Sequence, residues 1–151
     1  RREISPIELT EAMLARIERL DGRLHSYITV MPEHARAQAR AAEQAIAAGD
    51  YRGRLHGVPI ALKDLVNTCD APTTCASPLL RDFRPSYDAA VVERLDAAGA
   101  VTLGKLNLTE FALYGYHPSH TPPTNPWKLD HWAGVSSSGS GAATAASLCY
   151  S

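Results

Sequence analysis

The first fifty residues place apolar side chains at the spacing of two amphipathic helices. Ser5 followed by Glu8 has the capping-box spacing, and Asp21-Gly22 predicts the end of the first helix. A second, alanine-rich helix is predicted over 35–48, after Pro32. Both helices are explained by packing alone. The apolar stripe of the first helix recurs every three or four residues and comprises Ile7, Leu9, Met13, Leu14, Ile17 and Leu20.

From Gly53 onward the pattern changes to short apolar runs that alternate with helices. The run over 57–66 predicts a buried strand ending near Lys63-Asp64, and the run over 100–103 predicts a second strand. Helices are predicted over 88–98 and 142–148. This alternation is typical of an α/β core. The remaining segments, 67–86 and 114–133, are rich in Pro, Thr, Ser or aromatic residues and are predicted to be loops.

Charge and composition exclude several classes of protein. Fifteen Lys and Arg residues against sixteen Asp and Glu residues give a net charge of −1, which argues against a nucleic-acid partner. No apolar run approaches the roughly 18–20 residues of a membrane span, and the amino end does not resemble a signal peptide. Three cysteines are an odd and sparse set, which favours a reducing compartment, and a cytoplasmic location is expected.

Two segments carry candidate chemistry. Lys63 follows the apolar run Val58-Pro59-Ile60-Ala61-Leu62. It is either a strand-end lysine with its head in solvent or a desolvated lysine whose lowered pKa makes it a general base. The Gly- and Ser-rich segment 134–141 is a flexible linker, a phosphate loop or a tight hydroxyl-rich turn that opens a helix. Ser140 stands where a phosphate loop needs lysine, so the tight turn, suited to proton relay, is favoured.

The histidines and cysteines do not have metal-ligand spacing. His117, His120 and His131 lie in the loop region with no carboxylate or cysteine pair at metal-ligand spacing, so no metal and no organic cofactor is expected. The segment Asn125-Pro126-Trp127 predicts a turn with a packed aromatic ring.

Five segments together resemble the amidase signature family of serine hydrolases. The resemblance implies an α/β fold with a mixed β-sheet core surrounded by helices, of which this chain supplies the amino-terminal portion. Residues 1–52 would form a helical lead-in, and 53–151 would form the first part of the core. The matching segments are 57–64, 88–100, 104–112, 125–127 and 134–140.

The resemblance implies a Ser–cis-Ser–Lys triad. Lys63 matches the base, and Ser136 matches the bridging serine, whose preceding peptide bond is cis in the family. The sequence departs from the family at Gly134-Val135, where Gly-Gly is common. The nucleophilic serine is expected about two dozen residues beyond Ser136, near position 160. Residues 1–151 alone are therefore expected to be inactive.

The implied activity is hydrolysis of a carboxylic amide, or of a related ester or carbamate, with a small molecule as substrate. Neither nucleic acid nor membrane is expected as a partner, and a homodimer is allowed. Supporting roles fall to Ser137 and Ser140 near the base and to Asp64 at the strand end. Residues expected to line the substrate pocket are Tyr114, Tyr116 and Trp132.

Two alternatives stay open. One is the glutamine-hydrolysing component of a tRNA-dependent amidotransferase, whose loop before the Asn-Pro-Trp segment is usually small and polar. Here the corresponding residues, 114–123, are bulky and aromatic, which favours a stand-alone amidase. The other is a non-catalytic module that binds an anion or nucleotide at the Ser/Gly turn.

Overall fold

The computed structural model describes residues 3–113 and 115–150. Two long helices, α1 (Pro6–Leu24) and α2 (Pro32–Ala47), flank the first strand, β1 (Tyr27–Val30). The strands β2 (Pro59–Lys63) and β3 (Val101–Leu106) follow, with the helix α3 (Ala90–Ala97) between them. A small hairpin of β4 (Thr124–Asn125) and β5 (Lys128–Trp132) precedes the last helix, α4 (Ser138–Ala145). Two single 3₁₀ turns are η1 (Pro78–Leu80) and η2 (Glu110–Ala112).

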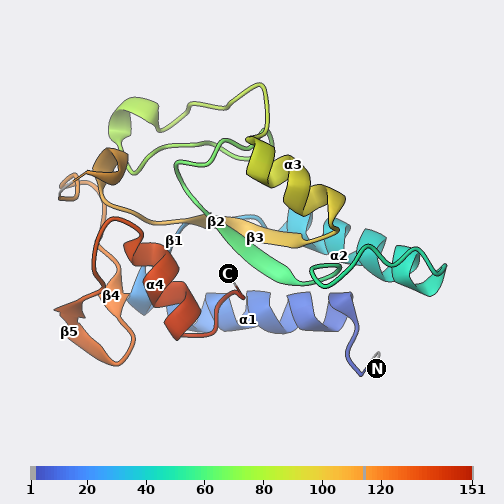
Figure 1. The fold of residues 1–151 in the computed structure, drawn as a ribbon. Helices are drawn as coiled ribbons and strands as arrows, with labels where there is room; N and C mark the ends of the chain where they lie inside the picture. Colours follow the sequence, from blue (N-terminus) through green and yellow to red (C-terminus); the bar gives the residue numbers. More distant parts are fainter. Residues whose placement is uncertain (1–2, 114, 151) are drawn as a thin grey trace.

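The central sheet is mixed. Its strand order is β1-β3-β2, with β1 antiparallel and β2 parallel to β3 (Figure 1). Lys63, the last residue of β2, lies opposite Leu106, the last residue of β3. The prediction of an α/β fold with a mixed sheet is confirmed. The division of the chain at residue 52 stays a prediction.

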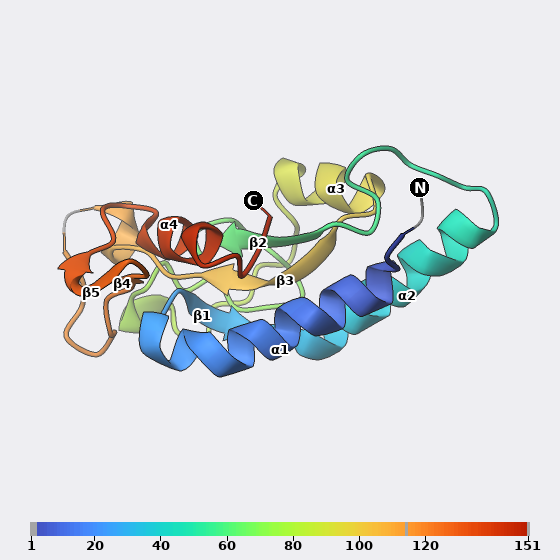
Figure 2. The ribbon, with the colours of Figure 1, turned by 90° about the horizontal axis from the view of Figure 1, so that it is seen from below.

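The helices bury the two faces of this sheet in separate apolar clusters. The first cluster joins α1, α2 and α4 to the sheet, and Figure 2 shows α1 and α2 side by side along it. Its members include Met13, Ile17, Ala39, Ala61, Leu103, Leu106 and Ala143. The second cluster joins β2 to α3 through Ile60, Leu62, Val92 and Ala100. Alternating residues of β2 thus enter different clusters, as expected for a strand buried on both faces.

The first helix extends beyond its predicted end. Asp21-Gly22 does not stop the helix, which continues to Leu24; the Asp21 carboxylate instead accepts hydrogen bonds from the backbone N–H groups of Ser26 (2.8 Å) and Tyr27 (3.1 Å) beyond the helix end. The chain reverses at His25, which has a left-handed backbone with φ of 52°. The capping box of Ser5 and Glu8 is present, as predicted.

Three short strands were not predicted. The strand β1 lies between the two predicted helices, and the β4–β5 hairpin lies in the predicted loop over 114–133. Every residue of β5 is exposed, so no buried face marks it as a strand. The prediction that Trp127 is packed is wrong, because this ring is 81% exposed at the hairpin. Within the described residues, no helix is both long and apolar enough to cross a membrane.

Candidate active site

The structure brings Lys63 and Ser136 together although 73 residues separate them in sequence. The Lys63 Nζ atom donates a hydrogen bond of 2.8 Å to Ser136 Oγ. The peptide bond between Val135 and Ser136 is cis. Both features agree with the geometry expected from the sequence. An amine and a hydroxyl at this distance can exchange a proton once the amine is neutral.

The surroundings of Lys63 make its neutral form more accessible than that of an exposed lysine. The residue ends β2, and its side chain is partly buried. Burial lowers the pKa of Lys63 below the ordinary value of a lysine, because desolvation disfavours the ammonium ion. A lysine with a lowered pKa is better suited to accept a proton near neutral pH than an exposed one.

The turn that carries Ser136 is held by backbone contacts with the segment after β3. The Thr109 N–H donates to the carbonyl oxygen of Ser136 (3.2 Å), and the Gly139 N–H donates to that of Asn107 (2.9 Å). Asn107 is almost fully buried, and its side-chain amide donates to the carbonyls of His25 (3.0 Å) and Thr121 (3.1 Å). The position of Ser136 is therefore set by groups that follow β3 and not by the serine turn alone.

The other serines of the turn have different environments. Ser137 precedes α4, is exposed and makes no side-chain cap on that helix. Ser140 lies in the first turn of α4 and is half-buried. Neither hydroxyl makes a hydrogen bond to Lys63 in the part of the chain that the structure describes, so their supporting roles stay predictions. Ser138 is buried, and its hydroxyl has no hydrogen-bond partner among the described residues.

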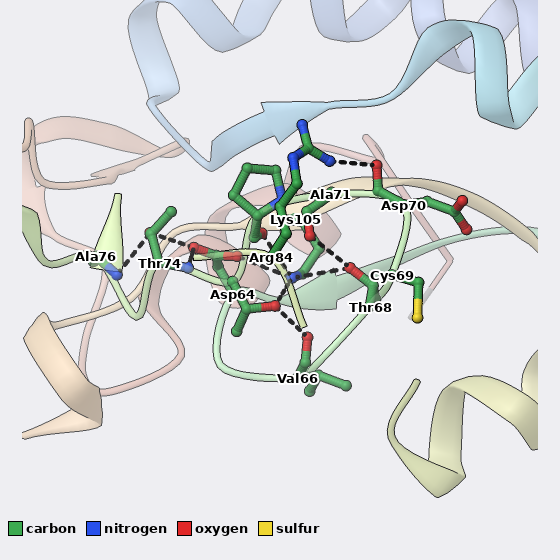
Figure 3. A network of polar contacts seen from close by, with 12 residues as sticks. Asp64, Val66, Thr68, Cys69, Asp70, Ala71, Thr74, Ala76, Arg84 and Lys105 are labelled. Atoms are coloured by element: carbon green, nitrogen blue, oxygen red, sulfur yellow. Dashed lines mark hydrogen bonds and ion pairs between the residues drawn. The ribbon is translucent and has the colours of Figure 1, made fainter. Parts of the chain in front are cut away.

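Asp64 lies at the centre of a buried polar network (Figure 3). One carboxylate oxygen lies 3.0 Å from Lys105 Nζ, and both side chains are fully buried. The other oxygen accepts from the backbone N–H and the hydroxyl of Thr74. These contacts hold the strand end at Asp64. Lys105 was not recognised as part of the site, because its sequence neighbours give no sign that it meets Asp64.

The residues expected to line the substrate pocket are not gathered into one site by the described contacts. Tyr114 lies outside the described residues. Tyr116 is half-buried, and its hydroxyl is enclosed without a hydrogen-bond partner among the residues described. Trp132 ends β5 and is 53% exposed. A cavity of about 850 Å³ lies elsewhere, between the start of α1 and the end of α2, and includes neither Lys63 nor Ser136.

The loop histidines make separate surface contacts: His117 and His120 contact Ser119, and His131 Nδ1 lies 2.9 Å from the Asp130 carboxylate. His117 Nδ1 lies 2.8 Å and His120 Nδ1 lies 3.2 Å from the hydroxyl of Ser119, all on the surface. Over residues 3–113 and 115–150, no group of three or more His, Cys, Asp or Glu side chains is placed to hold a metal ion.

A partly buried lysine at the end of a sheet strand, hydrogen-bonded to a serine, is the arrangement that a serine hydrolase with a lysine base requires. Comparison with known proteins gives the family: the model of the amidase family matches residues 8–151, and the chain belongs to this family.

Several relatives and solved structures are similar to this chain. A putative amidase AmiD of Mycobacterium tuberculosis is 60% identical over 149 residues, which are 99% of this chain and 31% of the relative. A component of the glutamyl-tRNA(Gln) amidotransferase from Methylococcus capsulatus is 53% identical over 98% of this chain and 31% of its own length. The native peptide amidase of Stenotrophomonas maltophilia has a TM-score of 0.89 at 38% identity, over 97% of this chain and 32% of that structure. The chain thus spans about a third of the length of these relatives.

Proposed function

We propose that the protein hydrolyses carboxylic amides through a triad of Lys63, Ser136 and a nucleophilic serine outside residues 1–151. The observation that carries this proposal is the 2.8 Å contact between Lys63 Nζ and Ser136 Oγ in a member of the amidase family. Esters and carbamates fall within the same chemistry, because each presents a carbonyl carbon to the nucleophile.

In this mechanism Lys63 is the general base. Neutral Lys63 takes the proton of Ser136 as the Ser136 oxygen takes the proton of the nucleophile. The nucleophile adds to the substrate carbonyl, and the relay then returns a proton to the departing amine, which leaves an acyl-enzyme. Water, activated by the same relay, hydrolyses this ester and regenerates the serine. The lowered pKa of Lys63 supports its role, since the ammonium form cannot accept a proton.

A second candidate is glutamine hydrolysis within a tRNA-dependent amidotransferase. The similarity to a component of a glutamyl-tRNA(Gln) amidotransferase favours it. The bulky residues 115–123, which include Tyr116, favour the stand-alone amidase. The two functions differ in one measurable respect: a stand-alone amidase hydrolyses simple amides by itself, whereas the amidotransferase component requires its partner.

The test replaces members of the relay in the full-length protein and measures hydrolysis of a panel of amides. Lys63→Ala and Ser136→Ala should each lower turnover by at least about 10²–10⁴-fold, the usual contribution of a general base. Ser138→Ala is the matched control, because the buried Ser138 hydroxyl has no hydrogen-bond partner among the described residues to lose. Wild-type turnover in Lys63→Ala would eliminate the mechanism. Saturable nucleotide binding without amide turnover would favour the non-catalytic module instead.

A further inference from the structure

The buried pair of Asp64 and Lys105 lies immediately beside the proposed base, and the mechanism above does not use it. The Lys105 ammonium faces the Asp64 carboxylate at 3.0 Å, and it donates to Thr73 Oγ1 (2.9 Å), to the Pro72 carbonyl (3.2 Å) and to Thr68 Oγ1 (3.4 Å). An ammonium has only three protons, so every donor is engaged. This set of acceptors favours the charged form of Lys105 although burial lowers its pKa.

An irregularity in β3 directs Lys105 toward Asp64. The register against β2 shifts between the pairs Ile60–Thr102 and Leu62–Lys105, so β3 contains one extra residue there. Leu103 and Leu106 both enter the first apolar cluster, which strict alternation would not allow. The extra residue moves Lys105 to the opposite face of the sheet. Such bulges re-aim side chains, commonly next to active sites.

The contacts of Asp64 on one face of the sheet also fix the position of Lys63 on the opposite face. Ala61 belongs to the first cluster, with α1 and α4, whereas Leu62 belongs to the second, with α3. Alternation continued along the chain places Lys63 on the α4 side, where Ser136 lies, and Asp64 on the far side. The Asp64 N–H donates to the Leu106 carbonyl (2.9 Å), which extends the ladder past Lys63. The strand end is therefore pinned on both sides of the proposed base.

The pair also determines the net charge at the residue that follows the base in sequence. An uncompensated carboxylate one residue from Lys63 would stabilise its ammonium form and so oppose proton acceptance. The Lys105 ammonium cancels that charge. Other titratable groups lie around the pair: the Cys75 thiol interacts electrostatically with both members, and Asp70 and Arg84 lie in the same network (Figure 3). Glu110 lies in η2 after β3, and α4 carries no charged residue.

We propose that Lys105 is a positioning residue for amide hydrolysis: by pinning the end of β2 it holds Lys63 within reach of Ser136, and by neutralising Asp64 it removes a negative charge that would favour the ammonium form of Lys63. The inference rests on the proposed function, because it concerns how well Lys63 serves as the base.

The test is the pH dependence of kcat/KM in the full-length enzyme. Its acid limb reports the protonation of the free enzyme's base. Lys105→Met leaves Asp64 uncompensated and should move the limb to higher pH by roughly 0.5–1 unit. Asp64→Asn leaves the Lys105 ammonium uncompensated and should move it to lower pH. The double variant removes both charges and should restore the wild-type limb. Lys128→Met, which removes an exposed lysine of β5, is the matched control and should leave the limb unchanged.

Opposite shifts in the two single variants and recovery in the double variant support the inference, since loss of packing alone has no reason to reverse sign. The inference is overturned if the acid limbs of the two single variants do not move, or if both move in the same direction. If a single variant does not fold, the double variant is the test. An acid limb at the wild-type pH in the double variant supports the inference. A displaced acid limb, or a double variant that does not fold, overturns it. An inactive wild-type enzyme, or an active Lys63→Ala variant, would instead refute the proposed function. Either result is distinguishable from a failure of the inference about Lys105.

Discussion

Gly139 occupies a position where the backbone of three segments meets, and substitution by alanine should be strongly destabilising. A β-carbon at this position would lie 2.4 Å from the Asn107 carbonyl oxygen, 2.5 Å from the Asn107 nitrogen and 2.5 Å from the Ser26 carbonyl oxygen. All three are backbone atoms, so no side-chain rotation relieves the contact. Ordinary contact begins near 3.4 Å, and α4 would therefore have to move by about 1 Å.

Two hydrogen bonds resist that movement. The Gly139 N–H donates to the Asn107 carbonyl at 2.9 Å, and the Asn107 N–H donates to the Ser26 carbonyl at 2.8 Å. Overpacking a core typically costs about 1–3 kcal/mol, and weakening a hydrogen bond adds about 1 kcal/mol. Alanine regains at most about 1 kcal/mol of helix propensity. The net loss in the free energy of unfolding should be about 1–3 kcal/mol.

The matched control is Gly141→Ala in the same helix. A β-carbon there has its nearest neighbour, the Ala133 carbonyl oxygen, at 3.6 Å, which is ordinary contact. Gly141→Ala should therefore be neutral or should stabilise by about 0.5–1 kcal/mol. Thermal unfolding of both variants, measured side by side, should place the Tm of Gly139→Ala several degrees lower. A Gly139→Ala variant as stable as Gly141→Ala would refute the close approach of the three backbones.

Three further predictions concern the base, the segment that holds the serine turn and the cap of α1. For the base, kcat/KM should rise with pH, and the midpoint of the rise should lie below the ordinary lysine pKa of 10.5. The reason is that burial lowers the pKa of Lys63 and only the neutral amine accepts a proton. A pH–rate profile measures the midpoint. Asn107→Leu should lower the free energy of unfolding by about 2–4 kcal/mol in a denaturant titration, because the buried N–H of Leu108 loses its acceptor and the carbonyls of His25 and Thr121 lose a donor. Ser5→Ala should cost about 1 kcal/mol by thermal unfolding, because it removes the capping box with Glu8.

The long helices and the buried strands could be predicted from the sequence because their signals are local. The apolar stripe of α1 and the apolar run that ends at Lys63 can each be recognised from residues that are close together in the sequence. The exposed hairpin could not be predicted, since β5 buries neither face and so lacks the alternation that marks a strand. The strand β1 has only four residues, too few for a period to be recognised.

The candidate site was only partly accessible from the sequence. The apolar run before Lys63 left open whether this lysine is solvated or desolvated. The pairing of Lys63 with Ser136 was predicted only from the resemblance to the amidase signature family. Lys105 shows why spacing alone falls short. Strict alternation from Leu103 would place Lys105 in the first apolar cluster, and the extra residue in β3 reverses this. A bulge depends on how two strands pair, which no local pattern records.

The end of β3 controls both halves of the proposed relay. Lys105 binds Asp64 and so fixes the end of β2, which carries Lys63. The carbonyl of Asn107 and the N–H of Thr109 hold the turn that carries Ser136. The two groups that must exchange a proton are therefore both positioned by one short segment, 105–109, and not by two independent loops. Since neighbouring sites in one network do not act additively, variants at Lys105 and Asn107 should couple in their effect on turnover, although neither side chain makes a hydrogen bond to Lys63 or Ser136 in the described contacts.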